Sequence, residues 1–504
     1  MRGYFMVLVV VALTWIAPLR EARAKPITRP TAVLAKFTLG APSGLDGLKA
    51  FADSMQPGVG GMLSASMILK SGMGLPLDGL DASAPLHVLM VADQTDRAIH
   101  GFVLVGKVSD AKLVATDAVK KGGWAVVGDP RLSKLAAPWA LATLTGPVPP
   151  DLIGTFYPDS ALAVYGAEFQ MVKAMSAQQT GSGMSGQFMT AWWDGFEGFI
   201  KDTLAVTLRF DVDANHLGVD LAFAPKAKSR LATFVAAQKP MDLALLGKLA
   251  AAPSSILMAG KLSLGPYRDA MVQVMAMFYG QGSNTDIAAT FAELMQKTTG
   301  DFAAAMNVGP KSGIQMRALY GVADPTGLDA TVGKMFATMA KPQTVTMSGV
   351  TTTTVAVPGT TTYDGTTIRT YESTTTPATI GNGKIRGSVG VVDKLIVMAS
   401  DGDMKRTIDV ARGKGTALVP TASQQTAFAR AAKRQDSLAM TMDFAAFAAM
   451  SPTPLKLPAG SELLFSMGFA DRSAHVYLGM PAATFRAMMP GAQHPASSPG
   501  AQRP

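Results

Sequence analysis

A serine and a lysine three positions apart are the first residues that could do chemistry. Ser109 and Lys112 match the pattern S-x-x-K, in which the lysine accepts the proton of the serine hydroxyl during acyl transfer. Lys311, Ser312 and Gly313 precede an expected strand, as the K-T-G element of such enzymes does, but the chain has no S-D-N element. One hypothesis is therefore a serine hydrolase that uses Ser109 and Lys112. The alternative is a helix cap at Ser109 and a hairpin turn at 311–313.

A second candidate is the start of a calcium loop. Asp211, Asp213 and Asn215 have the D-x-D-x-N spacing that supplies the first oxygen ligands of such a loop. His216 stands where the loop needs glycine, and Ala222 stands where it needs glutamate. The pattern therefore predicts a polar hairpin turn rather than a calcium site.

Other motifs for catalysis, metals or cofactors are missing from the sequence. The chain has no cysteine, which excludes disulfides, thiolate metal sites, iron-sulfur clusters and thiol catalysis. There is no G-x-S-x-G, Walker A, H-E-x-x-H or strand-anchored G-x-G-x-x-G pattern. No two histidines have a ligand spacing on one element; they are His87, His100, His216, His475 and His494. We expect no metal and no cofactor.

Alternating apolar runs around polar turns predict the elements that would position any site. Four segments read as hairpins of two antiparallel strands; they begin at Pro85, Thr203, Asp301 and Glu462. A short apolar strand is expected before each hairpin, at Ala32–Thr38, Ser160–Tyr165, Ser255–Gly260 and Ser437–Met442. A helix is expected after each hairpin, at Ser109–Lys120, Lys228–Ala237, Leu328–Met339 and Ala482–Met489. Two of the first strands are followed by expected helices at Tyr267–Phe278 and Phe444–Met450.

The same order of strand, helix, hairpin and helix thus recurs four times along the chain. An additional strand and helix follow Gly122 and again Gly390. We therefore predict two homologous halves, 31–249 and 250–490, each with two units. Because hairpins make antiparallel sheets, the expected class is α+β, with mainly antiparallel sheets and helices packed on one face. Chance similarity among many hairpins is the alternative to a true repeat.

Three stretches depart from this repeating order. Residues 341–385 are rich in threonine, and their β-branched alternation predicts exposed strands in the second half only; a flexible glycosylated segment is the alternative. Residues 176–187 predict a mobile loop before a helix whose aromatic stripe is expected to be core; the stripe is Phe188, Trp192, Phe196 and Phe199. The tail 491–504 is rich in proline, alanine, serine and glycine, which predicts disorder.

The N-terminus has the three parts of a secretory signal peptide. Arg2 gives a cationic start, an apolar run extends from Tyr4 to Ala17, and Ala22-Arg23-Ala24 forms an A-x-A cleavage site. We predict a signal peptide at 1–24 and a periplasmic or secreted mature chain. A retained membrane anchor is the alternative, but a spanning helix takes about 20 apolar residues, and no other segment is long and apolar enough.

Charge and methionine content bear on which partners the chain could bind. Lysine and arginine give a net charge of +9 but are scattered, which argues against nucleic acid and allows weak attraction to an anionic envelope. Methionine is frequent, at 31 residues. Its flexible thioether fills irregular cores, which is the default interpretation, and it also lines promiscuous apolar grooves, which makes a lipid-like ligand groove the first alternative. A copper site is the second alternative. Several methionines lie in apolar segments, among them Met271, Met275, Met277, Met335, Met339, Met440 and Met442.

The signal segment, the repeated α+β units and the shortage of catalytic groups resemble, in style, large secreted proteins of Gram-negative bacteria that are classed as domains of unknown function. This resemblance identifies no functional residue. The first hypothesis is a non-enzymatic periplasmic or secreted protein that binds a protein partner or an apolar, lipid-like ligand. The serine hydrolase is the second hypothesis. A structural or adhesive envelope protein, based on the threonine-rich strands, is the third.

Overall fold

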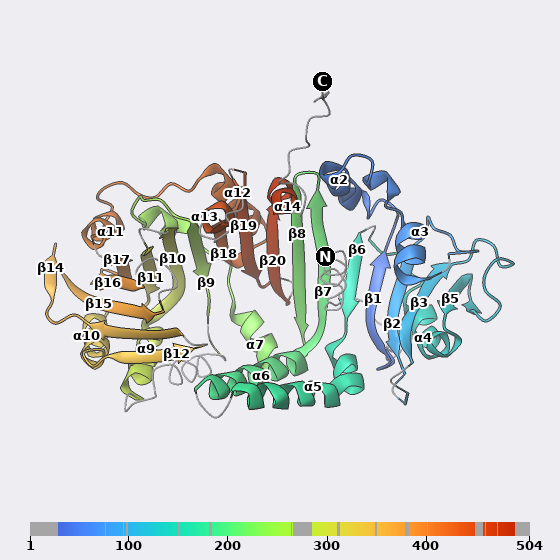
Figure 1. Cartoon of the computed structure of the whole chain (residues 1–504), viewed down its shortest axis with the longest axis horizontal. Helices are drawn as coiled ribbons and strands as arrows, with labels where there is room; N and C mark the ends of the chain where they lie inside the picture. The colour runs from blue at the N-terminus through green and yellow to red at the C-terminus, as the bar shows by residue number, and fades with distance from the viewer. Residues whose placement is uncertain are drawn as a thin grey trace, which may run out of the picture. The chain divides into compact units, whose positions relative to one another are not determined.

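The computed structural model describes residues 29–488 apart from 76, 94, 97–98, 150, 181–183, 264, 266–284, 310–312, 348–349, 378–382, 401, 449–456, 459 and 471. The expected signal peptide 1–24, the expected helix Tyr267–Phe278 and the tail 491–504 lie outside the described residues. Mixed helices and antiparallel strands confirm the α+β class (Figure 1).

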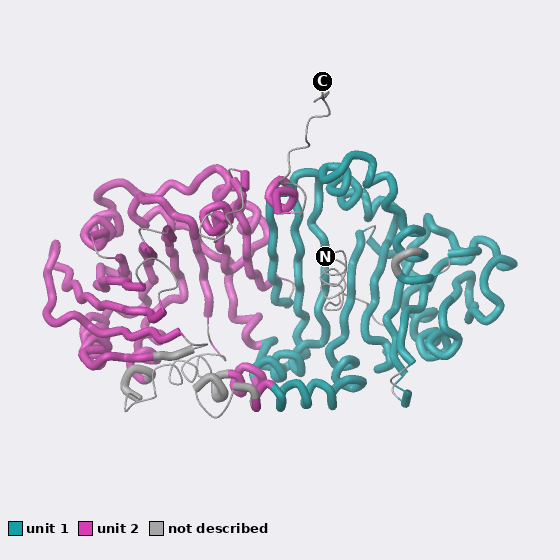
Figure 2. The backbone as a smooth tube through the Cα atoms, viewed as in Figure 1, with its two compact units in different colours: residues 1–175, 195–232, 472–482 teal, residues 176–194, 233–471, 483–504 magenta. Residues whose placement is uncertain are grey.

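The chain divides into two compact units (Figure 2). Unit 1 contains residues 1–175, 195–232 and 472–482, and unit 2 contains 176–194, 233–471 and 483–504. This division differs from the expected continuous halves 31–249 and 250–490. Residues 472–482 belong to unit 1 because the strand at Ala474–Pro481 pairs along its whole length with the strand at His216–Pro225.

Unit 1 contains one antiparallel sheet, in the order β4–β5–β3–β2–β1–β6–β7–β8–β20. The strands are β1 Val33–Leu39, β2 Leu86–Ala92, β3 His100–Lys107, β4 Val119–Lys121, β5 Trp124–Gly128, β6 Leu152–Phe156, β7 Thr203–Asp213, β8 His216–Pro225 and β20 Ala474–Pro481. The hairpins expected from Pro85 and Thr203 are confirmed as β2–β3 and β7–β8.

Two layers cover the central strands of this sheet, one on each face. The helices of this part of the chain are α2 Asp46–Met55, η1 Gly60–Met62, α3 Ala65–Met67, η2 Ile68–Gly72, α4 Pro130–Thr143, α5 Pro158–Thr180 and α6 Met184–Asp202. On one face α4 packs through Leu132, Ala136 and Trp139 against Leu89 and Val103. On the other face the segment carrying α3 and η2 covers β1 and β2. The sequence pattern predicted helices on one face only. In this sheet that prediction is wrong, because α4 and the α3–η2 segment cover opposite faces.

The strands of unit 2 are also antiparallel, in the order β19–β18–β9–β10–β11–β17–β16–β15–β13–β12, with β14 paired to β15. Its strands are β9 Ile256–Lys261, β10 Thr298–Gly309, β11 Gly313–Val322, β12 Gln343–Met347, β13 Val350–Ala356, β14 Thr361–Tyr363, β15 Thr366–Thr376, β16 Lys384–Val392, β17 Leu395–Ser400, β18 Asp436–Asp443 and β19 Glu462–Gly468. The remaining helices are α7 Arg230–Ala237, η3 Leu243–Lys248, α9 Thr285–Lys297, α10 Leu328–Thr338, α11 Met404–Ala411, α12 Ala422–Lys433, α13 Phe444–Ala448 and α14 Ala482–Met488.

The threonine-rich segment forms strands β12 to β15, as its β-branched alternation predicts. Cross-strand hydroxyl pairs join these strands: Thr344 Oγ1 lies 3.0 Å from Thr353 Oγ1, and Thr354 Oγ1 lies 3.0 Å from Ser373 Oγ. Asp364 and Gly365 adopt positive φ at the tight turn between β14 and β15. Gly365, with a φ of +73°, has the left-handed conformation that glycine adopts at little steric cost.

One predicted strand is wrong. Residues Ser160–Tyr165 lie in helix α5, and the strand of this part of the chain is β6, a few residues earlier. Pro158 fits the first turn of a helix, and the following run is rich in alanine, glutamine and other good helix formers. That run continues the helix far beyond the short apolar segment that resembled a strand.

One predicted helix is also wrong. Residues Ser109–Lys120 form turns that lead into β4, not a helix. The Gly79 carbonyl accepts hydrogen bonds from the backbone N–H groups of Ser109 and Asp110. The Asp110 carboxylate then accepts one from the N–H of Lys112 at 2.9 Å. Such a side-chain bond to the backbone competes with helix formation.

The expected mobile loop at 176–187 is largely helical. Helix α5 continues to Thr180, and α6 begins at Met184. The aromatic stripe of α6 is packed in part: Phe199 lies edge-on against Phe223 with ring centroids 5.2 Å apart, whereas Trp192 is 47% exposed. Among the described residues, no helix combines the length and apolar character needed to cross a membrane.

Candidate functional site

The pair predicted from S-x-x-K lies on the surface of unit 1. Ser109 and Lys112 are both exposed, in the turn that precedes β4. Both residues are described, and no hydrogen bond joins their side chains. Because the segment is not helical, the one-turn spacing that would bring the lysine to the serine hydroxyl is not present in this structure. Lys311 and Ser312 lie outside the described residues.

The residues that resembled a calcium loop form the tip of the β7–β8 hairpin. The Asp213 carboxylate accepts a hydrogen bond from the N–H of Asn215 at 2.7 Å, and Asp211 accepts one from the Tyr477 hydroxyl at 2.8 Å. The Tyr477 oxygen also lies 2.6 Å from His216 Nε2. These contacts explain the predicted polar turn. In the described part of the chain, no three histidine, aspartate or glutamate side chains gather as metal ligands would.

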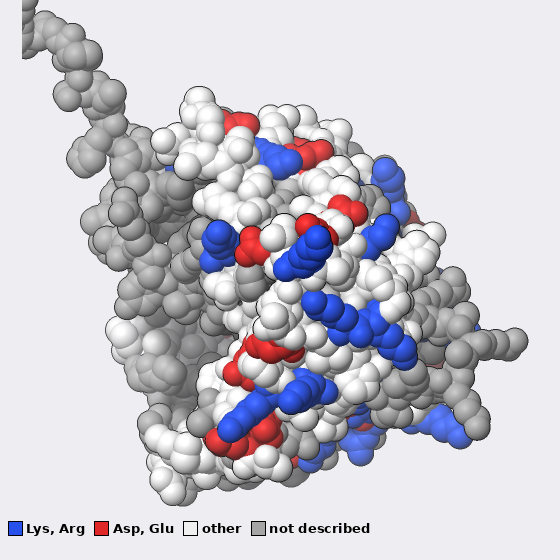
Figure 3. Space-filling model, turned by 90° about the vertical axis from the view of Figure 1, so that its right-hand side faces the viewer, with Lys and Arg blue, Asp and Glu red and all other residues white. Residues whose placement is uncertain are grey.

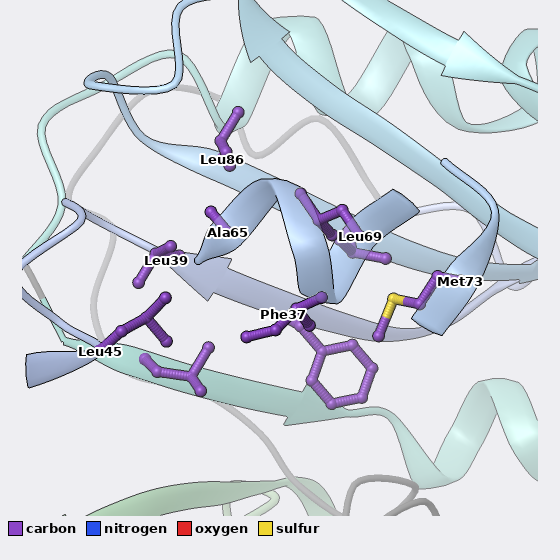
Figure 4. Close-up of a pocket in the computed structure, with 10 residues that line it drawn as sticks. Phe37, Leu39, Leu45, Ala65, Leu69, Met73 and Leu86 are labelled. Atoms are coloured by element: carbon purple, nitrogen blue, oxygen red, sulfur yellow. The ribbon is translucent and has the colours of Figure 1, made fainter. Parts of the chain in front are cut away.

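An apolar cavity in unit 1 is the feature best suited to hold a ligand. It lies between strands β1, β2 and β6 on one side and the α3–η2 segment on the other, with a volume of about 70 Å³. Every lining residue is apolar: Phe37, Leu39, Leu45, Ala65, Ile68, Leu69, Met73, Leu86, Val88 and Leu152. Figure 4 shows the short helix with Ala65 and Leu69 above the strands, and the Met73 sulfur near the Phe37 ring.

The floor of the cavity follows from the register of three strands. Leu39 on β1 lies opposite Leu86 on β2 and opposite Leu152 on β6. Residues opposite each other in antiparallel strands point to the same face, so this row presents three leucines to the cavity. One pleat further along, Phe37 lies opposite Val88 and Gly154.

Gly154 on β6 leaves room for the Phe37 ring in the floor of the cavity. A Cβ added at Gly154 would lie 3.2 Å from two atoms of that ring, which is closer than ordinary carbon contacts. The bare glycine therefore lets the ring lie over β6. Because Phe37 is 8% exposed, it is both a core residue and a wall of the cavity.

The roof of the cavity is the α3–η2 segment. The Ser64 hydroxyl caps α3 by accepting a hydrogen bond from the N–H of Met67 at 3.1 Å. Ala65, Ile68 and Leu69 face the strands and line the cavity, whereas Ser66 and Lys70 are exposed. Met67 is 43% exposed on the outer side. This arrangement makes the roof a short amphipathic cover over an apolar floor.

No charged or polar side chain is among the ten residues that line the cavity. A ligand inside it could therefore form no ion pair or hydrogen bond with a lining side chain. The nearest titratable residue on β2, His87, points to the opposite face, where its Nδ1 lies 2.9 Å from Thr38 Oγ1. Burial, together with the nearby charge of Lys36, lowers the pKa of His87 to about 3. On the face of the molecule shown in Figure 3, basic and acidic side chains are interspersed.

No family model matches the chain, and no curated protein matches it either. Two solved structures of TP0453 are similar to part of it. Crystal form III is 11% identical with a TM-score of 0.26, and its match covers 50% of this chain and 98% of that chain. Crystal form IV is 9% identical with a TM-score of 0.26, covering 50% and 97%. Likenesses this weak do not bear on function.

Sequence reasoning did not identify the cavity. The methionines singled out from the sequence lie elsewhere: Met335 and Met339 pack against the core of unit 2, and Met271, Met275 and Met277 lie outside the described residues. The feature of the sequence that could have indicated the cavity is the segment 58–74, which contains five glycines together with Met62, Met67 and Met73. Glycine and methionine together indicate a bendable apolar segment.

Proposed function

We propose that unit 1 binds the apolar chain of a lipid-like ligand in the cavity beneath the α3–η2 segment, and that the protein acts by binding rather than by catalysis. The observation that carries this proposal is the lining, which consists of ten apolar side chains. A ligand group with hydrogen-bonding atoms would lose its water there without compensation, at a cost of about 1–3 kcal/mol for each group. A hydrocarbon chain loses nothing of this kind and gains about 0.8 kcal/mol for each methylene buried.

The volume favours an unbranched chain over a bulky ring system. At about 70 Å³, the cavity is about half the size of the 150 Å³ engineered cavity that holds benzene. It therefore suits the end of an acyl chain, with the polar head group outside in water. We take a medium-chain fatty acid as the ligand class to test.

The first prediction concerns the roof residue Ala65. Ala65→Phe is expected to fill the cavity and weaken dodecanoate binding by at least about tenfold, because the ring would occupy the space of several methylenes. Binding can be measured by isothermal titration calorimetry with dodecanoate. Ser66→Phe is the matched control, because it adds the same ring to the exposed side of the same helix.

Equal dodecanoate affinity in Ala65→Phe and the native chain would contradict binding at this cavity. An equal loss in both phenylalanine variants would also contradict it, because the outer ring of Ser66→Phe does not reach the lining residues. Thermal unfolding of both variants shows whether each one is folded.

We also propose that the fold consists of repeated units in two homologous halves. The strand order β5–β3–β2–β1–β6–β7 of unit 1 corresponds, strand by strand along the chain, to β17–β11–β10–β9–β18–β19 of unit 2. An additional strand followed by a helix occupies the same place in each order, β5 with α4 and β17 with α11. An experimental structure in which these strand sets cannot be superposed in this order would contradict the duplication.

A periplasmic or secreted location is proposed from the signal-like N-terminus. It is tested by fractionating cells that make the full chain and by sequencing the N-terminus of the mature protein. The expected first residue is Lys25. Recovery of the protein in the cytoplasm with Met1 retained would contradict this proposal.

A further inference from the structure

We infer that residues 61–74 form a hinged lid that opens to admit the ligand; this inference rests on the proposed function. The segment contains the end of η1, α3 and η2 and provides the cavity residues Ala65, Ile68, Leu69 and Met73. The cavity, at about 70 Å³, is smaller than the 300–1,000 Å³ of ordinary ligand pockets. With the roof in this position it has room for only a short length of hydrocarbon chain, and movement of the roof would admit more.

The lid is fixed at both ends and free to bend beside each fixed point. At its start, the N–H of Gly60 donates to the Asp53 carboxylate of α2 at 2.7 Å, and a Cβ at Gly60 would collide with the Lys49 carbonyl. The next residue, Gly61, has no atom within 4 Å of where its Cβ would lie. At its end, Gly74 has a φ of +67° and similarly open surroundings, and Leu75 is 4% exposed in the core. Glycines so placed can change backbone angles at little steric cost.

Between these hinges the lid is held down by apolar contacts. The hydrogen bonds recorded for the described atoms of residues 61–73 stay within the stretch 59–75, and none of them reaches β1, β2 or β6. Contact with the floor depends on the four cavity side chains. Opening therefore breaks no hydrogen bond to the sheet, and an entering hydrocarbon chain can replace the apolar contacts that are lost. A segment attached in this way belongs to the low-stability part of a fold.

The structure of the lid is also irregular in a way that suits movement. A single turn of α-helix, Ala65–Met67, continues directly into the π-helical turn Ile68–Gly72. Turns of this kind are rare and occur often at functional sites. On its outer side the lid exposes Met62 by 64% and Met67 by 43%. These flexible thioethers can rotate against an incoming apolar chain before the lid opens.

The lid is tested by the reactivity of one buried thiol. The native chain has no cysteine, so Leu69→Cys introduces a single thiol under the lid, where Leu69 is 6% exposed. Leu104→Cys is the matched control, because Leu104 is 0% exposed in β3 and belongs to the same core cluster. We expect an aromatic disulfide reagent to label Leu69→Cys at least about a hundredfold faster than Leu104→Cys, because lid opening is a local event. Saturating dodecanoate is expected to slow labelling of Leu69→Cys alone.

Equal, slow labelling of both thiols would overturn the lid, even if calorimetry shows dodecanoate binding. Fast labelling of Leu69→Cys without dodecanoate binding would support the lid and overturn the fatty-acid proposal, so the two failures are distinguishable. If either cysteine variant fails to fold, amide hydrogen exchange of the native chain gives the same answer. Residues 61–74 should then exchange well before β2, and protection of the two segments to the same degree would overturn the lid.

Discussion

Phe37→Ala is expected to lower the free energy of unfolding by about 3–5 kcal/mol, the usual cost of removing a buried phenylalanine ring. Phe37 lies in the middle of β1, is 8% exposed, and contacts the core that includes Leu69, Leu86 and Val88. Its ring rests over Gly154, which has no side chain to fill the space. The void would therefore stay open and join the cavity of about 70 Å³ that Phe37 lines. Urea unfolding at neutral pH measures the loss.

The enlarged cavity gives this variant a second property. We expect benzene to raise the unfolding midpoint of Phe37→Ala, since an apolar cavity enlarged by one aromatic ring can hold such a molecule. Phe336→Ala is the control, because Phe336 is 7% exposed in the core of unit 2 and the void left there would not join this cavity. The control should lose similar stability and recover less of it with benzene. A loss below about 1 kcal/mol for Phe37→Ala would show that Phe37 is not a wall of the cavity.

The strands of this fold were predictable wherever two runs alternate around a polar turn. The hairpins β2–β3, β7–β8 and β10–β11 lie where the pattern placed them, because alternation fixes both the strand and its buried face. Residues Ser160–Tyr165 were assigned wrongly because a short apolar run does not distinguish a strand from the first turns of a helix. At Ser109–Lys120, hydrogen bonds to Gly79, a residue thirty positions earlier, decide the turn.

The cavity was not predictable from local patterns because its residues come from four separate segments. Phe37, Val88 and Leu152 lie on different strands, and only the pairing of β1 with both β2 and β6 brings them to one face. The roof has no long apolar period, since it combines 3₁₀, α and π turns within 60–72. Its glycines and methionines indicated flexibility, but the sequence pattern alone could not show which surface they cover.

His87 gives the fold a dependence on acid that can be predicted with its sign. Its side chain is 0% exposed, its Nε2 has no hydrogen-bond partner, and it lies on β2 between the cavity residues Leu86 and Val88. Burial and the charge of Lys36 hold its pKa at about 3 in the folded protein, although the Leu144 carbonyl acts in the opposite direction.

The unfolded chain binds a proton at this histidine near pH 6.5, whereas the folded chain does so only near its folded pKa of about 3. Stability from this group is therefore fully present above pH 6.5 and is lost as the pH falls, by about 1.4 kcal/mol for each pH unit down to the folded pKa. Between pH 7 and pH 5 the native chain should lose about 2 kcal/mol more than His87→Gln, which cannot titrate there. Urea unfolding of both proteins at the two pH values measures this difference, and carboxylates common to both contribute equally.

Equal losses in the two proteins would mean that the folded protein binds a proton at His87 as readily as the unfolded chain does, so that burial does not lower the pKa of His87. A larger loss in the native chain would instead mean that acid weakens the strand that forms the cavity floor, so dodecanoate should then dissociate at pH 5 more readily from the native chain than from His87→Gln.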